Sequence, residues 1–192
     1  MASSKREVFQ LHISLKNSKP RIWRRVLVPS DFVLSDLHCI IQSAMGWSNV
    51  HLHQFVIDGK FYAPKHIDDD FIEPTGKDCG GLRIDCFLKA EGDKIQYDYD
   101  FGDGWEHIIK LEAILPFSNM AKYPICVAGK MNCPPEDSGG IYRYRAMLEI
   151  LKQPDHEEYD NTINWLDGNF NPRHFSIDVV NGLLGQPNFG CR

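Results

Sequence analysis

The sequence contains no apolar run that approaches the length of a membrane-spanning helix. Its first residues, Met1 to Phe9, are mostly polar and lack the apolar core of a secretory signal. These absences argue against an integral membrane protein and against a secreted one. We therefore expect a cytoplasmic protein that has no membrane partner.

Fingerprints of well-known catalytic sites are also missing. The chain has no Gly-x-Ser-x-Gly elbow, no phosphate-binding loop, no dinucleotide-binding glycine motif and no His-Glu-x-x-His. No cofactor can be assigned from such motifs. Whether the chain is an enzyme therefore stays open at the level of its residues.

Cysteines are scattered, and acidic residues outnumber basic ones. The six cysteines show no tight framework spacing, so reduced thiols in a cytosol are the default expectation. The net charge is −5, from 21 Lys and Arg against 26 Asp and Glu. This balance argues against a surface that coats nucleic acid generally, although it allows a local basic patch.

Hydrophobic periodicity places strands mostly in the first part of the chain and helices in the last. Alternating patterns predict strands at residues 8–16, 22–28, 51–62 (a hairpin), 82–89 and 97–111. A first helix is expected to begin at a Ser35 cap and to end at Gly46, and further helices follow residue 140. Asp155 with Glu158 resembles a capping box, and Ser176 is expected to cap the last helix. This order predicts an α+β fold with a largely antiparallel sheet of hairpins.

The length of 192 residues suits a single domain with a substantial core. Residues 1–6 are expected to form a disordered tail, and residues 116–140 an unusually long ordered loop. That loop ends in the rigid sequence Cys-Pro-Pro-Glu-Asp-Ser-Gly-Gly at 133–140. Because long ordered loops often carry function, Glu136 and Asp137 are candidate binding residues.

The densest group of reactive side chains lies in the predicted hairpin at residues 97–107. A three-residue loop, Gly102 to Gly104, would pair Phe101 with Trp105 and Tyr99 with His107. This register separates an aromatic face from an acidic one, so we prefer it to a two-residue loop.

The acidic face of this hairpin requires compensation. In the preferred register Asp100 lies opposite Glu106, and Asp98 follows on the same face. Like charges directly opposite each other destabilise a strand pair. Water, a basic side chain or a divalent metal ion would have to offset them, and a basic side chain is the commoner solution.

A basic segment precedes and enters the second predicted strand. Arg21, Arg24 and Arg25 flank Trp23, with no acid among residues 16–25. One interpretation is a nucleic-acid contact, in which the arginines bind phosphate and the indole stacks on a base. The other, which the acidic total favours, is a solvated hairpin whose arginines pair with acids elsewhere.

For each of three histidines the sequence allows two interpretations, a chemical role as metal ligand or general base and a purely structural role. His51 and His53 project to one face of a strand and could share a metal, but a hydrogen-bonded pair fits their spacing better. His107 near Asp103 invites a general-base role. Its place on the aromatic face favours a structural histidine instead.

The motifs of this chain resemble the Ri-plasmid ORF-three-like family, which is also associated with transposons. The resemblance covers nearly the whole chain and rests on Pro-Arg-Ile-Trp-Arg-Arg at 20–25, Ala-Met-Gly-Trp at 44–47, His-Leu-His-Gln-Phe at 51–55, the 99–107 hairpin, the 133–140 segment and Phe-Asn-Pro at 170–172. Ile-Tyr-Arg-Tyr at 141–144 departs from the family pattern. The resemblance implies a compact α+β fold, a prokaryotic family found on chromosomes and mobile elements, and no established activity.

Three hypotheses follow. The first is a non-enzymatic binding or accessory domain, acting on nucleic acid through Arg21, Arg24 and Arg25 or on another protein. The second is a metal-dependent hydrolase or nuclease. Its carboxylates would be Asp98, Asp100, Glu106, Glu136 and Asp137. The third is a purely structural role, in which residues 133–140 pack against the 102–107 turn. We expect that packing under all three hypotheses.

Overall fold

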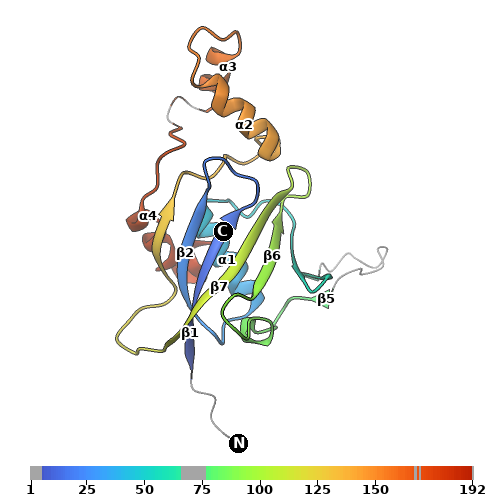
Figure 1. Ribbon diagram of the computed structural model, residues 1–192, viewed down its shortest axis with the longest axis vertical. Coiled ribbons are helices and arrows are strands. Elements are labelled where there is room, and N and C mark those ends of the chain that lie inside the picture. The colour runs from blue at the N-terminus through green and yellow to red at the C-terminus, as the bar shows by residue number, and fades with distance from the viewer. Residues whose placement is uncertain (1–5, 66–76, 167, 169, 192) are drawn as a thin grey trace, which may run out of the picture.

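An eight-stranded sheet forms the centre of the computed structural model, which describes residues 6–65, 77–166, 168 and 170–191 (Figure 1). The strand order is β5-β4-β3-β6-β7-β1-β2-β8, and only β4 and β5 are parallel neighbours. The described strands are β1 (Glu7–Leu15), β2 (Trp23–Pro29), β3 (His53–Ile57), β4 (Lys60–Ala63), β5 (Lys77–Asp78), β6 (Lys94–Tyr99), β7 (Trp105–Pro116) and β8 (Ile125–Lys130). The predicted α+β fold is confirmed.

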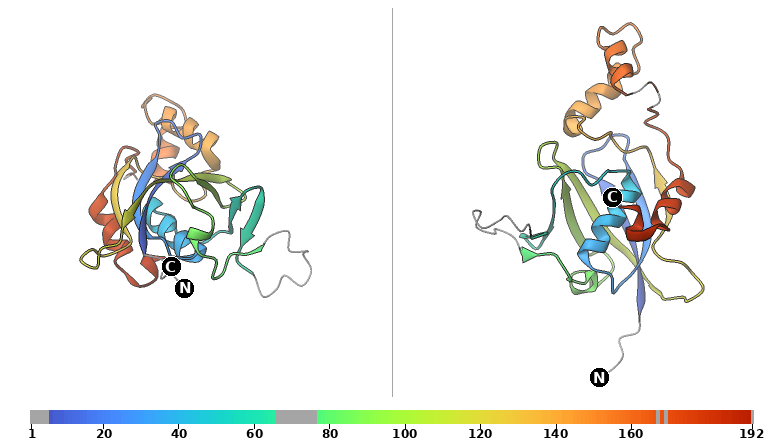
Figure 2. Two further views of the ribbon diagram at one scale, coloured as in Figure 1. Left: turned by 60° about the horizontal axis from the view of Figure 1, so that its bottom comes forward. Right: turned by 180° about the vertical axis from the view of Figure 1, so that it is seen from behind.

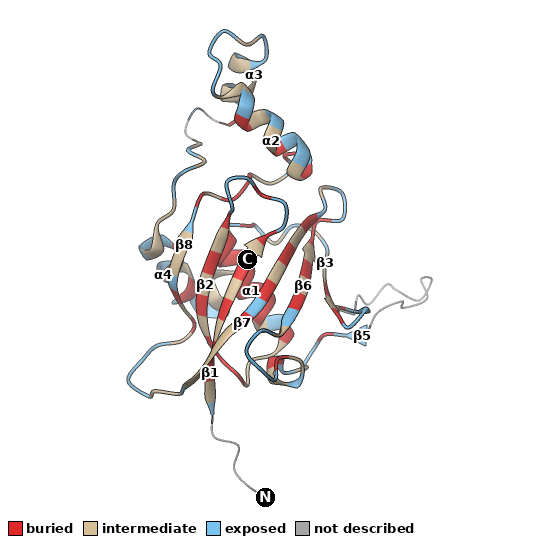
Figure 3. Cartoon of the chain, in the orientation of Figure 1, coloured by how far each residue is buried: buried red, intermediate tan, exposed pale blue. Residues whose placement is uncertain are grey.

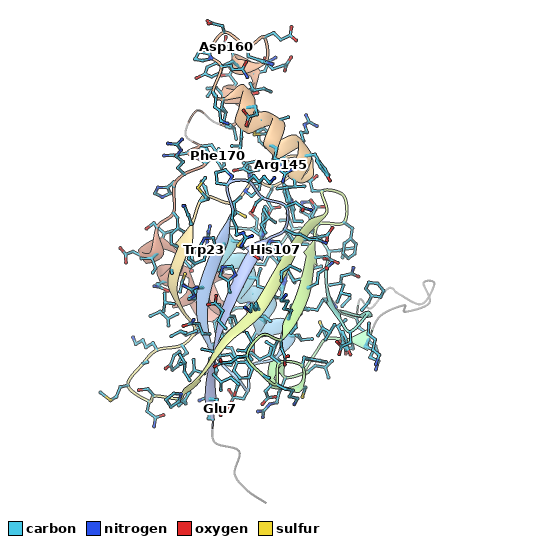
Figure 4. The ribbon with its side chains drawn as sticks, in the orientation of Figure 1. Glu7, Trp23, His107, Arg145, Asp160 and Phe170 are labelled. Carbon is cyan, nitrogen blue, oxygen red and sulfur yellow. The ribbon has the colours of Figure 1, made fainter. Side chains whose placement is uncertain are left out.

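Helices occupy two places around the sheet. Figure 2 shows α1 (Leu34–Met45) and α4 (Ile177–Leu184) on the concave face of the curved sheet. The short 3-10 turn η3 (Pro187–Gly190) packs beside α1, where Ser43 Oγ donates to the Phe189 carbonyl at 2.6 Å. By contrast, α2 (Gly140–Ile150) and α3 (Tyr159–Trp165) project from one end of the molecule. Asp160 lies at the tip of this projection, and Glu7 lies at the opposite end (Figure 4).

The core lies between the sheet and α1. Strand β7 alternates between buried and more exposed residues from Trp105 to Leu111, as the colours of Figure 3 show. Leu37, Ile40 and Ile41 of α1 are fully buried against the same core. The period-two pattern of the strands and the helical period of α1 therefore bury one continuous apolar face.

Helix ends follow the predictions only in part. Ser35 is not the cap of α1: the N-cap residue is Val33, whose N–H donates to Asp36 Oδ2 at 3.1 Å. Gly46 ends α1 as expected, in the left-handed conformation with φ 97°. The Ser176 side chain caps α4 as expected. The predicted capping box at α3 does not form, because its N-cap is Glu158, whose side chain makes no capping hydrogen bond.

Two segments differ from their predicted conformation. Residues 82–89 do not form a strand but contain the 3-10 turn η2 (Ile84–Cys86). Ile84 in this turn and Leu88 beyond it are both buried. Residues 116–140, expected to be a loop, include strand β8, which pairs with the edge of β2. In both cases the contacts that select the conformation come from distant parts of the chain.

The amino-terminal prediction falls largely outside the described residues. Residues 1–5 of the expected tail lie there, whereas Arg6 is described and its Nε lies 3.0 Å from Asp31 Oδ2. Among the described helices, none combines the length and the apolar character that crossing a bilayer requires.

Candidate metal centre

The loop between β6 and β7 is longer than expected, because the strand pairing ends one residue pair before the predicted loop. Strand pairing joins Tyr99 with Trp105 and Tyr97 with His107, so residues 100–104 form the loop and the predicted register is wrong. Asp100 has a left-handed φ of 55°, and its carbonyl accepts the Gly104 N–H at 2.6 Å. This closed turn takes the chain out of the ladder one residue earlier and leaves the Phe101 ring exposed.

The corrected register redistributes the acids of the hairpin. Asp98, not Asp100, lies opposite Glu106. Asp98 accepts hydrogen bonds from Gln54 and Gln96, and Glu106 Oε2 lies 2.5 Å from Lys16 Nζ. The expected repulsion on this face is therefore offset by amides and one lysine, and neither acid takes part in the site described below.

The segment 133–140 packs against the hairpin turn, as predicted. The Gly139 N–H donates to Asp103 Oδ2 at 2.9 Å. A Cβ atom on Gly140 would come within 2.5 Å of the Asp103 carbonyl oxygen, so the two backbones touch where only glycine fits. This contact carries Glu136 and Asp137 to the hairpin.

Four side chains from three loops converge beside this contact. The imidazole Nε2 of His51 lies 3.2 Å from Asp137 Oδ1, 3.6 Å from Asp100 Oδ2 and 3.8 Å from Glu136 Oε2. Ligand atoms of His51, Asp100 and Asp137 all lie within 4.8 Å of one another. We call this group the acid–histidine cluster. Imidazole nitrogen and carboxylate oxygen are the donors that Mn²⁺ and Zn²⁺ accept.

Backbone and hydroxyl groups hold one oxygen of Asp100 and one of Glu136. Asp100 Oδ1 accepts the N–H groups of Gly102 and Asp103 at 2.9 and 3.3 Å. These hydrogen bonds fix the carboxylate and turn its second oxygen, Oδ2, toward His51. The Asp100 side chain is only 9% exposed, so its charge lies in a largely desolvated position.

Glu136 is fixed in the same way. Its Oε1 accepts the Ser48 N–H at 2.6 Å and the Tyr99 O–H at 3.1 Å. Burial, together with the neighbouring Glu136 charge, raises the pKa of Tyr99, so the phenol stays a donor. Glu136 Oε2 and His51 Nε2 are buried atoms that lack a hydrogen-bond partner in the described structure. Each therefore presents an unused ligand position to the other members of the cluster.

Sequence reasoning did not connect His51 with the acids. That histidine was expected to pair with His53, but the two rings separate: His53 stacks on His38 with centroids 3.5 Å apart, whereas His51 joins the acids. Tyr99 was also missed as a group that positions Glu136. Spacing in the chain gives no sign of either contact, because Tyr99 and Glu136 are 37 residues apart and His51 is 49 to 86 residues from the three acids.

His107 and Asp103 do not form an acid–base pair. His107 is fully buried; Trp47 Nε1 lies 3.4 Å from its Nε2, and the Tyr97 carbonyl oxygen lies 3.3 Å from its Nδ1. Burial lowers the pKa of His107 to about 4, so the ring is neutral at neutral pH. The structural interpretation fits these contacts.

The favoured interpretation of the basic segment, in which its arginines pair with acids elsewhere, fits Arg25 but not Arg24. Arg24 is buried and donates to the carbonyl oxygens of Ala44, Trp23 and Lys130. Arg25 pairs with Glu112 through two hydrogen bonds of 2.5 and 3.0 Å. Trp23, labelled on β2 in Figure 4, stacks on His12, and Arg21 is exposed. Of these arginines, Arg24 is a core residue and Arg25 is already paired.

A second group of potential ligands is less suited to a metal. His38, Cys39 and Cys191 have ligand atoms within 4.8 Å of one another. However, His38 Nδ1 lies 2.8 Å from the Tyr97 hydroxyl and Nε2 lies 2.8 Å from Asn49 Oδ1. Both ring nitrogens are thus occupied, so the acid–histidine cluster is the stronger candidate.

Three comparisons show which known proteins this chain is similar to. The model of the family described as "Plasmid pRiA4b ORF-3-like protein" matches residues 7–179. The "Uncharacterized protein y4hQ" of Sinorhizobium fredii is 37% identical over 163 residues, covering 82% of this chain and 80% of that protein. The crystal structure of the protein of unknown function MM3350 from Methanosarcina mazei Go1 is 37% identical, with a TM-score of 0.80, covering 91% of this chain and 98% of that chain.

Proposed function

Since the chain belongs to the plasmid pRiA4b ORF-3-like family, whose two relatives named above have no assigned activity, we propose a function from the geometry: it is a binding domain that holds a divalent cation. The ligands are His51, Asp100, Glu136 and Asp137. The observation that carries this proposal is the pair of buried, unbonded ligand atoms, His51 Nε2 and Glu136 Oε2, which face each other within the acid–histidine cluster.

Charge balance supports a cation at this position. Asp100, Glu136 and Asp137 surround one imidazole, and no lysine or arginine makes an ion pair with them among the described residues. A protonated His51 would neutralise a single carboxylate. A divalent cation would neutralise two and leave the imidazole neutral as a ligand.

The mixed donor set indicates which cations to expect. Three carboxylates and one imidazole suit Mn²⁺ or Zn²⁺ better than Mg²⁺, which prefers an all-oxygen shell with several waters. Ca²⁺ also favours oxygen ligands. We therefore expect Mn²⁺ and Zn²⁺ to bind more tightly than Mg²⁺ and Ca²⁺.

A binding role is favoured over the hydrolase or nuclease alternative. That alternative needs several convergent carboxylates to hold two metal ions. Of its five expected acids, Asp98 and Glu106 lie on the outer face of the hairpin with their own partners. The remaining three surround a single imidazole, which supports one cation.

Apolar side chains beside the cluster support a contact surface. Val50, Leu52 and Phe101 are 66%, 54% and 55% exposed, and they neighbour His51 and Asp100 in the chain.

All six cysteines are free thiols. This supports a reducing, cytoplasmic setting as part of the proposal.

Thermal melts with added cations test the function. Mn²⁺ or Zn²⁺ is expected to raise the melting temperature of the wild-type protein, because a cation that binds only the native state stabilises it. Asp100→Asn is expected to abolish the rise, since asparagine keeps the left-handed turn but removes the charge. Asp98→Asn, two residues earlier on β6, is the matched control and should retain the full rise.

Two results would overturn the cation site. The first is a wild-type protein whose melting temperature no divalent cation changes, which would leave the acid–histidine cluster without a bound cation. The second is an equal rise in Asp100→Asn and Asp98→Asn, which would place the bound cation elsewhere. Isothermal titration of the same three proteins gives the stoichiometry, for which one cation per chain is expected.

A further inference from the structure

A cavity between α2 and α3 adjoins the proposed cation site. Its volume is about 340 Å³, and Asp137 and Ser138 form part of its wall. Small-molecule sites commonly have volumes of roughly 300–1,000 Å³. Asp137, whose carboxylate also belongs to the acid–histidine cluster, therefore lies between a cation position and a space large enough for a small organic molecule.

Arg143 is the basic residue of this cavity. Its side chain lies against the backbone of Gly139, where an added Cβ would come 2.4 Å from Arg143 Cδ. This contact fixes the stem of the side chain close to the segment that carries Asp137. In the described structure no hydrogen bond or ion pair engages the Arg143 guanidinium, so its donors remain available to an anion.

Trp165 supplies a planar apolar surface in the same cavity. Its side chain, at the end of α3, is 48% exposed, and Met147 of α2 also lines the space. Trp165 lines a second hollow together with Glu136 and Asp137. Trp165 and Asp137 thus line both hollows. An exposed indole in a pocket is well suited to stack on a ring.

Glu158 restricts the charge of an occupant. Its side chain lines the same cavity from the start of α3. A ligand with one anionic group can direct that group to Arg143 and the cation. A polyphosphate would also place negative charge near the carboxylate of Glu158, which is unfavourable.

We propose that this cavity binds a small molecule with one anionic group and one planar ring. The anion, a phosphate monoester or a carboxylate, is shared between the cation and Arg143, and the ring packs on Trp165. The proposal rests on the cation-binding function and adds to it the chemical class of the ligand.

Titration calorimetry with Mn²⁺-loaded protein tests the proposal with two probes. Adenosine 5′-monophosphate represents the phosphate monoesters, and indole-3-acetate represents the aromatic carboxylates. At least one of them is expected to bind, and removal of the cation by EDTA is expected to weaken that binding at least about tenfold, because the cation contributes half of the anion site.

Variants separate the two parts of the cavity. Arg143→Ala and Trp165→Leu are each expected to weaken the probe about tenfold or more while leaving Mn²⁺ affinity unchanged. Arg173→Ala, an exposed arginine outside the lining residues, is the control and should bind as the wild type does. Circular dichroism of each variant checks that α2 and α3 remain folded.

The outcomes distinguish this proposal from the cation function. Mn²⁺ binding without binding of either probe overturns the ligand and leaves the cation site intact. Probe binding that Arg143→Ala does not change also overturns it. Absence of Mn²⁺ binding overturns the cation function and the shared anion together.

Discussion

Arg24 shows that a charged residue within a basic motif can be part of the core. Its guanidinium donates to three backbone carbonyls and lies 4.5 Å from the centre of the Phe175 ring. Arg24→Ala is expected to lower the free energy of unfolding by about 3 kcal/mol, because buried carbonyl oxygens lose their donor. Arg21→Ala, at an exposed position, is expected to change it by less than about 0.5 kcal/mol.

Urea denaturation of the two variants measures this difference. Equal stability of Arg24→Ala and Arg21→Ala would contradict the structural role. For the same reason, a variant with alanine at Arg21, Arg24 and Arg25 must first be shown to be folded before a loss of nucleic-acid binding can be assigned to a lost contact.

At the scale of residues, the sequence identifies acids more readily than their partners. Asp100 is a candidate as part of the acidic face of the predicted hairpin, and Glu136 and Asp137 are candidates because they lie in a rigid proline-rich segment. His51 could not be assigned to them, since its neighbours in the chain predict a partnership with His53. Convergence of the four side chains depends on packing between three loops, which no local pattern encodes.

The contact between the hairpin turn and the start of α2 determines where the acids meet. Gly140 has φ +78°, and an added Cβ would meet the Asp103 carbonyl oxygen at 2.5 Å. Gly140→Ala is therefore expected to lower the free energy of unfolding by at least about 2 kcal/mol, from backbone strain and overlap. It is also expected to weaken cation binding, because Asp137 moves with this segment.

Gly182→Ala in α4 is the matched control. Nothing lies within 4 Å of its added Cβ, and alanine favours a helix over glycine, so stability should stay equal or rise. Thermal unfolding compares the two substitutions. A Gly140→Ala protein as stable as Gly182→Ala would show that the close approach is not required.

At the scale of elements, the alternation of apolar and polar residues predicts the hairpins. It does not predict elements whose hydrogen-bond partners lie far away in the chain. Strand β8 is an example: its Cys126 N–H donates to Asn181 Oδ1 at 2.7 Å, and Asn181 Nδ2 donates to the Cys126 carbonyl at 3.0 Å. A side chain of α4 thus takes the place of a neighbouring strand. The register of the central hairpin was also missed, because the Asp100 turn competes with ladder pairing.

The stability of the whole molecule is expected to fall in mild acid. Burial lowers the pKa of His38 and of His107 to about 4, below the usual value of 6.5. In this pH range the unfolded chain binds protons on these histidines that the native state does not bind. The free energy of unfolding therefore keeps its full value above about pH 6.5 and decreases as the pH falls toward 4. Between about pH 7.5 and pH 5, each histidine is expected to cost about 2 kcal/mol.

Denaturant unfolding at these two pH values measures the effect. His107→Gln and His38→Gln are each expected to reduce the loss of stability on acidification, whatever they do to stability at neutral pH. An unchanged difference between the two pH values in both variants would show that other groups cause the acid sensitivity.

Anomalous diffraction from a crystal of the wild-type protein grown with Mn²⁺ would locate the cation. One peak is expected within about 2.0–2.6 Å of His51 Nε2, Asp100 Oδ2, Glu136 Oε2 and Asp137 Oδ1. A map with no peak at these atoms under saturating Mn²⁺, or with peaks only at other carboxylates, would contradict the cation site.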